Sequence, residues 1–238
     1  MITVDSTVRV GLEEASNGFI HVHALSLPGC VASGPTKEIA LDRFTGELSR
    51  WLSFLSRKGA RVPPPESELE VAVDEWVATD ADVAAGESLV CFAVDRVYLD
   101  ETEAVVGVQL LGDLRGRLLP HIRRERDARL ESIGSPPVTL RTILDELARA
   151  QWWTLTRLGA SPMAEVPPSV VGRLDTAMAL VVQEIVHLSE DARGRVLLLD
   201  GEEWTARKVL RRLLWLEWSL GGAALRLLGL TGSTGSSR

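Results

Sequence analysis

The pattern of hydrophobic and polar positions changes its period part-way along the chain. In the first part, residues 8–13 and 19–25 alternate between apolar and polar side chains around a Ser-Asn-Gly turn, which predicts a β-hairpin. Apolar residues then recur at helical spacing over residues 36–59, which predicts one helix. Two further short apolar segments, 69–77 and 88–94, predict two more strands. The expected order is therefore β-β-α-β-β, a small α/β sandwich.

In the second part, from residue 103 onward, the apolar residues recur at helical spacing. The pattern predicts four helices, at about residues 103–130, 140–158, 170–190 and 205–228. Four helices of this length joined by modest loops form an antiparallel four-helix bundle. The fold class expected from the sequence is thus α+β.

Charge supports a division into two domains. The chain of 238 residues carries a net charge of −7. The first 101 residues contain 8 basic and 17 acidic side chains, whereas the remainder contains 18 and 16. Together with the change in period, this asymmetry predicts an α/β domain at residues 1–100 and a four-helix bundle at 101–230. The Gly- and Ser-rich residues 231–238 predict a flexible tail.

Composition also disfavours several functional classes. A negative net charge argues against nucleic acid as a partner. No apolar run reaches the roughly 18 residues of a membrane-spanning helix, and the N-terminal residues lack the basic and apolar regions of a signal peptide. We therefore expect a cytoplasmic protein that has neither a membrane nor nucleic acid as a partner.

Two short motifs lead into the predicted helix of the first domain. Residues 27–30 read Leu-Pro-Gly-Cys, and residues 34–40 read Gly-Pro-Thr-Lys-Glu-Ile-Ala. With the strand before them and the helix after them, they resemble the HicB-type antitoxin domain over roughly residues 6–60. The resemblance implies a degenerate ribonuclease-H-like sandwich and a protein partner, because members of this family neutralise a toxin. An antitoxin-like protein that binds its partner through the N-terminal sheet is therefore one hypothesis for function.

Two longer segments in the second domain carry another resemblance. Residues 143–155 read Ile-Leu-Asp-Glu-Leu-Ala-Arg-Ala-Gln-Trp-Trp-Thr-Leu, and residues 201–212 read Gly-Glu-Glu-Trp-Thr-Ala-Arg-Lys-Val-Leu-Arg-Arg. They are similar to the second helix and to the start of the fourth helix of the DinB-like four-helix-bundle superfamily. Many members of that superfamily bind a divalent metal through one histidine of the second helix and two histidines of the fourth. Some use the metal to activate a low-molecular-weight thiol.

None of the three ligand positions implied by this resemblance carries a histidine here. The second-helix position is Glu146, and the fourth-helix positions are Leu216 and Leu220. Helical spacing places the two leucines on an apolar stripe of the last helix, which predicts that they face the interior of the bundle. Leucine cannot coordinate a metal ion, so we expect that the metal site is lost and that the chain binds no metal or other cofactor.

The leading hypothesis for function is therefore a non-catalytic binding or scaffold protein, with a homodimer as an expected assembly. The alternative is a metal-dependent DinB-like enzyme of the thiol transferase class, and the sequence leaves open whether the chain is an enzyme. Such an enzyme would need a non-standard site. Glu184 and His187 lie three residues apart on the third predicted helix, where both side chains share one face, and Glu146 is the third candidate ligand.

Two histidines of the first domain form a further candidate cluster. His21 and His23 share one face of a predicted strand, and Cys30 follows after a turn. A half-exposed sheet face is the favoured interpretation, because a zinc site normally needs three or four converging ligands.

Large and charged side chains of the second domain mark candidate interfaces. Adjacent residues on a helix cannot both face the core, so one tryptophan of the pair at 152 and 153 is expected at a groove or an interface. The two arginines at 207 and 211 belong to a basic patch that suits the acidic first domain. The candidate interface residues are Trp152, Trp153, Trp218, Arg207 and Arg211.

Overall fold

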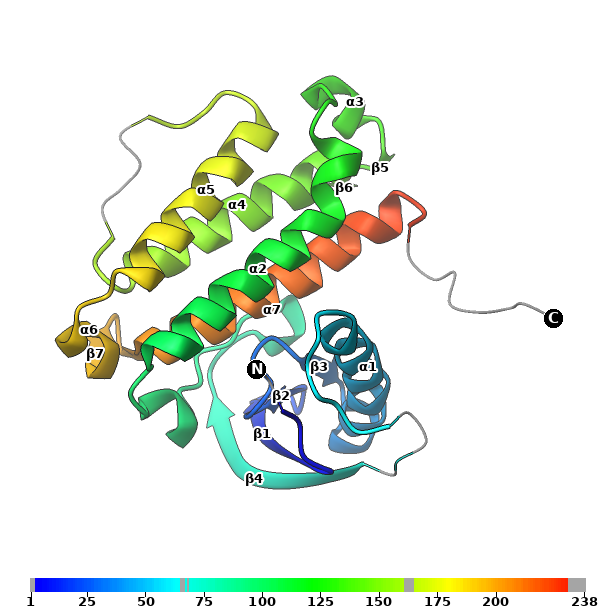
Figure 1. Cartoon of the computed structure of the whole chain (residues 1–238). Helices are drawn as coiled ribbons and strands as arrows, with labels where there is room; N and C mark the ends of the chain where they lie inside the picture. Colours follow the sequence, from blue (N-terminus) through cyan, green and yellow to red (C-terminus); the bar gives the residue numbers. More distant parts are fainter. Residues whose placement is uncertain (1–2, 65–66, 68, 161–164, 231–238) are drawn as a thin grey trace. The chain divides into compact units, whose positions relative to one another are not determined.

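The chain has a mixed α+β fold, with a sheet in its first part and several helices after it (Figure 1). The computed structural model describes residues 3–64, 67, 69–160 and 165–230. The chain separates into two compact units. The first unit extends to Arg96 and includes Leu198–Glu203, and the second begins at Val97 and includes the other described residues. The predicted tail at 231–238 lies outside the described residues.

The first unit is built on a four-stranded mixed sheet. Its strands are β1 (Thr7–Ala15), β2 (Ile20–Ala24), β3 (Val31–Gly34) and β4 (Glu70–Thr79), in the spatial order β3-β2-β1-β4. β2 is antiparallel to both β1 and β3, whereas β4 runs parallel to β1. The predicted hairpin is confirmed as the β1–β2 pair.

One long helix, α1 (Lys37–Arg57), packs on β2 and β3. It begins where the sequence predicts, because the side chain of Thr36 accepts a hydrogen bond from the backbone N–H of Ile39 and caps the first turn. Its apolar side chains recur at helical spacing and are buried. They are Ala40, Phe44, Leu48, Trp51, Leu52, Phe54 and Leu55.

The predicted strand at 88–94 is wrong. This segment leads into a short 3₁₀ helix, η2 (Ala93–Arg96), and another, η1 (Val83–Ala85), precedes it. A Cβ added to Gly11 of β1 would lie 2.4 Å from the ring of Phe92, so this segment lies against the sheet instead of pairing with it. The sequence also missed β3, whose residues Val-Ala-Ser-Gly include one strong strand former and pair with β2 through the backbone. The observed order is β-β-β-α-β.

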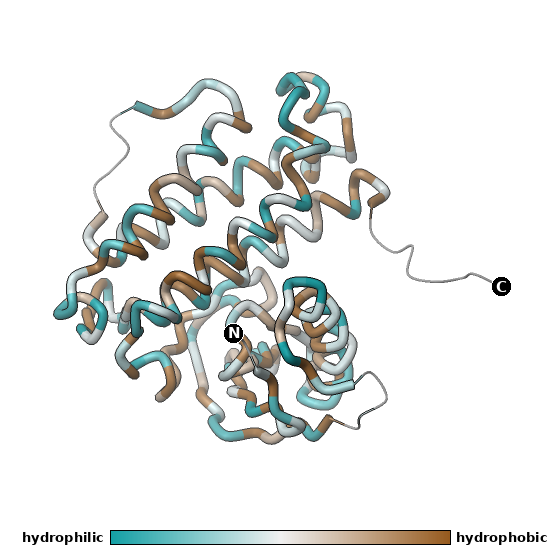
Figure 2. The backbone as a smooth tube through the Cα atoms, viewed as in Figure 1, coloured by the Kyte–Doolittle hydropathy of each residue, from teal (hydrophilic) through white to brown (hydrophobic). Residues whose placement is uncertain are grey.

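Four long helices form the second unit: α2 (Glu101–Ile122), α4 (Leu140–Thr156), α5 (Val170–Val186) and α7 (Ala206–Leu227). α4 packs on α5 and α7, and α2 packs on the same two helices. Hydrophobic and hydrophilic segments alternate along each of them (Figure 2), as expected for helices that bury one face. Among the described residues, no helix combines the length and hydropathy needed to cross a membrane.

The first predicted helix is too long at its C-terminal end. α2 ends at Ile122, and a separate short helix, α3 (Asp127–Glu131), follows it. The proline in the last turn of α2 removes one backbone donor there, which favours an early end. The remaining elements are short: β5 (Gly134–Ser135), β6 (Val138–Thr139), α6 (Glu190–Gly194), β7 (Leu197–Leu199) and β8 (Glu202–Trp204).

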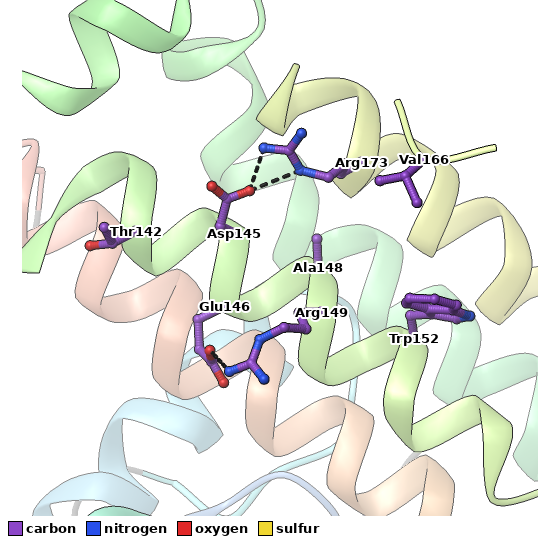
Figure 3. Close-up of a pocket in the computed structure, with 8 residues that line it drawn as sticks. All are labelled: Thr142, Asp145, Glu146, Ala148, Arg149, Trp152, Val166 and Arg173. Carbon is purple, nitrogen blue, oxygen red and sulfur yellow. Dashed lines mark hydrogen bonds and ion pairs between the residues drawn. The ribbon is translucent and has the colours of Figure 1, made fainter. Parts of the chain in front are cut away.

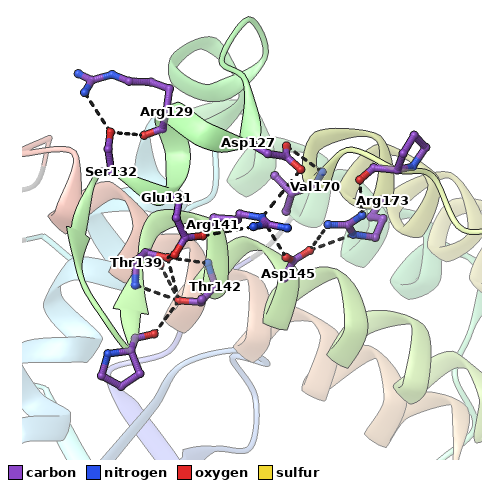
Figure 4. A network of polar contacts seen from close by, with 12 residues as sticks. Asp127, Arg129, Glu131, Ser132, Thr139, Arg141, Thr142, Asp145, Val170 and Arg173 are labelled. Carbon is purple, nitrogen blue, oxygen red and sulfur yellow. Dashed lines mark hydrogen bonds and ion pairs between the residues drawn. The ribbon is translucent and has the colours of Figure 1, made fainter.

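A network of charged side chains joins α3, α4 and α5 (Figure 4). Arg141 of α4 lies 3.4 Å from Glu131 and 3.9 Å from Asp127, both on α3. Asp145 of α4 accepts two hydrogen bonds from Arg173 of α5, at 2.9 and 2.6 Å. These contacts fix the register of the three helices along their polar side.

Candidate functional sites

A polar cluster lies inside the second unit, surrounded by its apolar core. It consists of Arg115 of α2, Gln151 of α4 and Glu217 of α7, and their side chains are at most 2% exposed. Nε and Nη2 of Arg115 donate to the two oxygens of Glu217, at 2.8 and 2.9 Å. Gln151 joins both partners, because its Oε1 accepts from Arg115 at 2.9 Å and its Nε2 donates to Glu217 at 2.7 Å.

The guanidinium of Arg115 also contacts α5, the remaining long helix of the second unit. Its Nη1 donates to the backbone carbonyl of Leu174 on α5, at 2.9 Å. One side chain of α2 therefore holds a polar contact with each of the other three long helices. Both oxygens of Glu217 are occupied by a two-pronged pairing, which is the strongest geometry for an arginine and a carboxylate.

The predicted burial of Leu216 and Leu220 is wrong, although Val209 and Leu213, earlier on the same apolar stripe, are buried. Leu216 and Leu220 are only partly buried and pack at the margin of the apolar core. Glu217, Gly221 and Ala224 are the buried residues of this stretch. The helix rotates in this way because Arg115 supplies a partner for the carboxylate, so burying Glu217 is tolerated.

Glu146, the expected ligand position of the second helix, lies outside the core. It pairs with Arg149 one turn along α4 and lines an open groove of about 530 Å³ (Figure 3). The Asp145–Arg173 pair and the ring of Trp152 lie along the same groove. The carboxylates in the groove are thus already paired with arginines.

The other two ligands of the predicted non-standard site also lie apart from the buried cluster. Glu184 is partly buried on α5, and His187 is exposed at the C-terminal end of that helix. In the described parts of the chain, Glu146, Glu184 and His187 do not come close enough together to share a metal ion. No single ion can therefore be held by these three side chains in this conformation.

Two of the candidate interface tryptophans lie in different surroundings. Trp153 is exposed, and its ring meets that of Trp204 edge to face at a centroid distance of 5.5 Å. Trp218 lies beneath the guanidinium of Arg117, 5.3 Å from the ring centroid. Both tryptophans therefore have partners within the second unit, and their role between units or between chains stays a prediction.

The two candidate interface arginines differ in exposure. Arg211 is buried. Arg207 forms an ion pair with Glu103 and donates to the backbone carbonyl of Tyr98, both within the second unit. Its charge therefore already has a local acidic partner.

A second buried polar cluster lies in the first unit, on the face of the sheet near Phe92. Glu13 of β1 and His21 and His23 of β2 are almost fully buried. Oε2 of Glu13 lies 3.3 Å from Nε2 of His23 and 3.8 Å from Nδ1 of His21. In the described part of the chain, these three residues form the one group of His, Cys, Asp or Glu side chains that could hold a metal ion.

The electrostatics of this cluster favour an ionised carboxylate. Burial alone raises the pKa of Glu13, but hydrogen bonds from His21, His23 and Ser88 and the charge of His23 together hold that pKa well below its usual range. The half-exposed sheet face predicted for His21 and His23 is wrong, because both side chains are buried. Cys30 is buried outside the group, and burial raises the pKa of its thiol, so it stays protonated.

The sequence did contain a signal for Glu13. The two-stranded hairpin was predicted, and its register places Glu13 directly opposite His21. Cross-strand neighbours share a face of the sheet, so the third member of the cluster follows from that pairing.

Comparisons of the chain with models of protein families, with curated proteins and with solved structures gave no match.

Proposed function

We propose that this chain is a non-catalytic binding or scaffold protein whose second unit is a DinB-like four-helix bundle that has lost its metal site. One observation carries the proposal: the guanidinium of Arg115 is buried among all four long helices. In the DinB-like family the metal ligands converge from the second and fourth helices. Gln151 and Glu217 are buried polar residues of α4 and α7, and both bind Arg115.

The buried guanidinium of Arg115 also opposes the binding of a divalent metal ion within the cluster itself. Arginine keeps its positive charge at every physiological pH. Glu217 is the one carboxylate of the cluster, and both of its oxygens already accept from Arg115. A metal ion there would face a fixed cation with no second carboxylate, and an amide is a weak ligand for transition metals. The residues present do not fit the metal that the family resemblance implies.

The groove beside α4 supports binding rather than acid–base chemistry. Its carboxylates, Asp145 and Glu146, are paired with Arg173 and Arg149. General acid–base catalysis needs a carboxylate that is available to a substrate proton, and both carboxylates of the groove are held in ion pairs with arginines. Trp152 and Ala148 give the groove an apolar wall that suits a bound ligand.

We expect that no metal ion binds in the second unit. Tag-free protein is equilibrated with zinc, nickel or ferrous iron, freed of loosely bound ions, and assayed for metal per chain. Glu217→Gln removes the one carboxylate of the buried cluster, and the paired change Glu184→Gln with His187→Gln removes the surface alternative. Both variants should hold as much metal as the unchanged protein. A stoichiometric loss of metal in either variant would overturn the non-catalytic proposal and favour the enzyme.

A scaffold role through the sheet is favoured by one further observation. β4 forms an edge of the sheet and is ten residues long. Val73 and Trp76 on this strand are 40% and 50% exposed. Long edge strands with exposed apolar side chains are sites for pairing with another chain. We propose that β4 adds a strand from a partner protein, which in the simplest case is a second copy of this chain.

This edge predicts a concentration-dependent dimer. Val73→Lys places a charge on the edge and should raise the dimer dissociation constant at least tenfold, because lysine on an edge strand opposes pairing. The control is Val182→Lys on α5, since that valine is 42% exposed and lies in the other unit. Light scattering over a concentration series measures both constants. Equal constants for the two variants would show that self-association does not use β4.

A further inference from the structure

We propose that Glu13, His21 and His23 form a structural zinc site in the first unit. This inference is independent of the proposed function, because it concerns a different unit and requires no catalysis. The three side chains come from two adjacent strands of one sheet and lie on the same face. Rigid strands hold metal ligands more accurately than loops do.

The strand register brings the three ligands together. Glu13 pairs directly with His21, and Gly11 pairs directly with His23. Because Gly11 has no side chain, the ring of Phe92 occupies the space above it. The centroids of the Phe92 and His23 rings are 5.3 Å apart. The rings of His21 and His23 are 5.6 Å apart and nearly perpendicular. The candidate ligand atoms all lie within 4.8 Å of one another.

The distances between the ligand atoms match those around a shared zinc ion, and without an ion Nε2 of His23 is within the outer limit of hydrogen-bond distance from Glu13. Hydrogen bonds between an imidazolium and a carboxylate are typically about 2.7–2.9 Å long. The two distances from the Glu13 oxygen to the histidine nitrogens are 3.3 and 3.8 Å. Two ligands of a tetrahedral zinc ion, with bonds of about 2.0–2.2 Å, are separated by roughly 3.4 Å. The spacing in the cluster is close to that separation.

A supporting shell fixes the carboxylate. Oε1 of Glu13 accepts hydrogen bonds from the backbone N–H groups of Leu89 and Val90, at 2.8 and 3.1 Å. These contacts orient the carboxylate so that Oε2 faces the histidines. Metal-binding carboxylates are commonly held in this way by a second set of hydrogen bonds.

The types of ligand atom decide which metal ion fits the site, and the burial of the three side chains decides the role of that ion. Two imidazole nitrogens and one carboxylate oxygen are a known zinc ligand set of catalytic sites, in which one water molecule is the fourth ligand. Calcium and magnesium need six or more oxygen ligands and do not fit. Because His21, His23 and Glu13 are buried, the ion would be closed off from substrates. It would fasten the segment that contains Leu89 and Val90 to the sheet.

The test uses full-length, tag-free protein, first stripped with a chelator and then given one equivalent of zinc or cobalt. Wild-type protein should bind one zinc ion per chain, show the intense visible absorption of tetrahedral cobalt, and melt at a higher temperature with zinc than with chelator. The paired change His21→Asn with His23→Gln should weaken zinc binding by more than the roughly 10–100-fold that loss of an outer hydrogen-bond partner costs. Glu217→Gln, in the other unit, should bind zinc normally.

The control is the pair His121→Gln with His187→Gln, which removes the other two histidines of the chain. This control should keep the zinc ion and the cobalt spectrum. Zinc retained by the His21/His23 variant would overturn the proposal. If that variant fails to fold, the wild-type protein alone decides, because the absence of tetrahedral cobalt absorption and of any zinc-induced shift in melting temperature would equally overturn it.

Discussion

Replacing Arg115 by methionine is expected to lower the free energy of unfolding by about 3–5 kcal/mol, the usual effect of breaking a buried ion pair from one side. The side chains of Arg115 and Glu217 are 2% and 1% exposed. The variant leaves the carboxylate of Glu217 in the apolar core with Gln151 as its remaining donor. Urea unfolding followed by circular dichroism measures the loss as a lower midpoint.

Three further variants separate the ion pair from simple packing. The double variant Arg115→Met with Glu217→Met removes both charges and should recover part of the lost stability, since well-packed apolar residues often replace a buried pair at little cost. Arg115→Lys keeps the charge but loses the two-pronged contact. Its free energy of unfolding should therefore lie between those of the wild-type protein and Arg115→Met. The matched control is Arg117→Met on the exposed side of α2, with an expected effect below about 1 kcal/mol. Equal losses for Arg115→Met and Arg117→Met would contradict the assigned role.

The helices of the second unit were largely predictable, but the pairing of their buried polar side chains was not. Arg115 lies at helical spacing from Leu111 and Leu118, which are both buried. That spacing was a usable signal that Arg115 faces inward. A lone arginine nevertheless indicates an exposed position unless its partner is known, and Glu217 is 102 residues away in the sequence.

The face of α7 that is buried could not be predicted for the same reason, because it depends on the distant partner of Glu217. α7 carries two adjacent stripes, one with Leu216 and Leu220 and one with Glu217 and Gly221. Hydrophobicity alone favours the leucines for the interior. The pairing with Arg115 reverses that preference, and such tertiary pairing is not visible in local spacing.

In the first unit the hairpin was predictable, but the burial of its outer face was not. The segment at 88–94 has the apolar pattern of a strand, and a strand would lie beside the sheet rather than over it. Its backbone donors at Leu89 and Val90 instead bind the side chain of Glu13. These two hydrogen bonds and the ring of Phe92 hold the segment over the sheet, so the expected half-exposed face is a buried cluster.

Replacing Glu13 by alanine is therefore expected to lower the free energy of unfolding by about 3–5 kcal/mol in the presence of a chelator. The change removes the acceptor that Leu89 and Val90 use and the carboxylate that faces His21 and His23. Glu13→Gln keeps one oxygen for the backbone donors and should cost less. The matched control is Glu14→Ala, the next residue of β1, whose carboxylate accepts one exposed hydrogen bond from Trp76. A loss of less than about 1 kcal/mol, as expected for this control, would contradict the role given to Glu13.

The same carboxylate predicts how stability depends on pH in the metal-free protein. The pKa of Glu13 in the folded state lies well below its usual range, whereas an unfolded chain has a glutamate pKa of about 4.3. The folded state therefore binds the proton less tightly, and the stabilisation is fully present above about pH 4.3 and declines as the pH falls below it. Glu13→Gln has no such carboxylate, so the stability difference between wild type and this variant should shrink between about pH 5 and pH 3. Urea midpoints of both proteins across that pH range measure this difference. A difference that does not change with pH would show that Glu13 does not stay ionised in the folded protein.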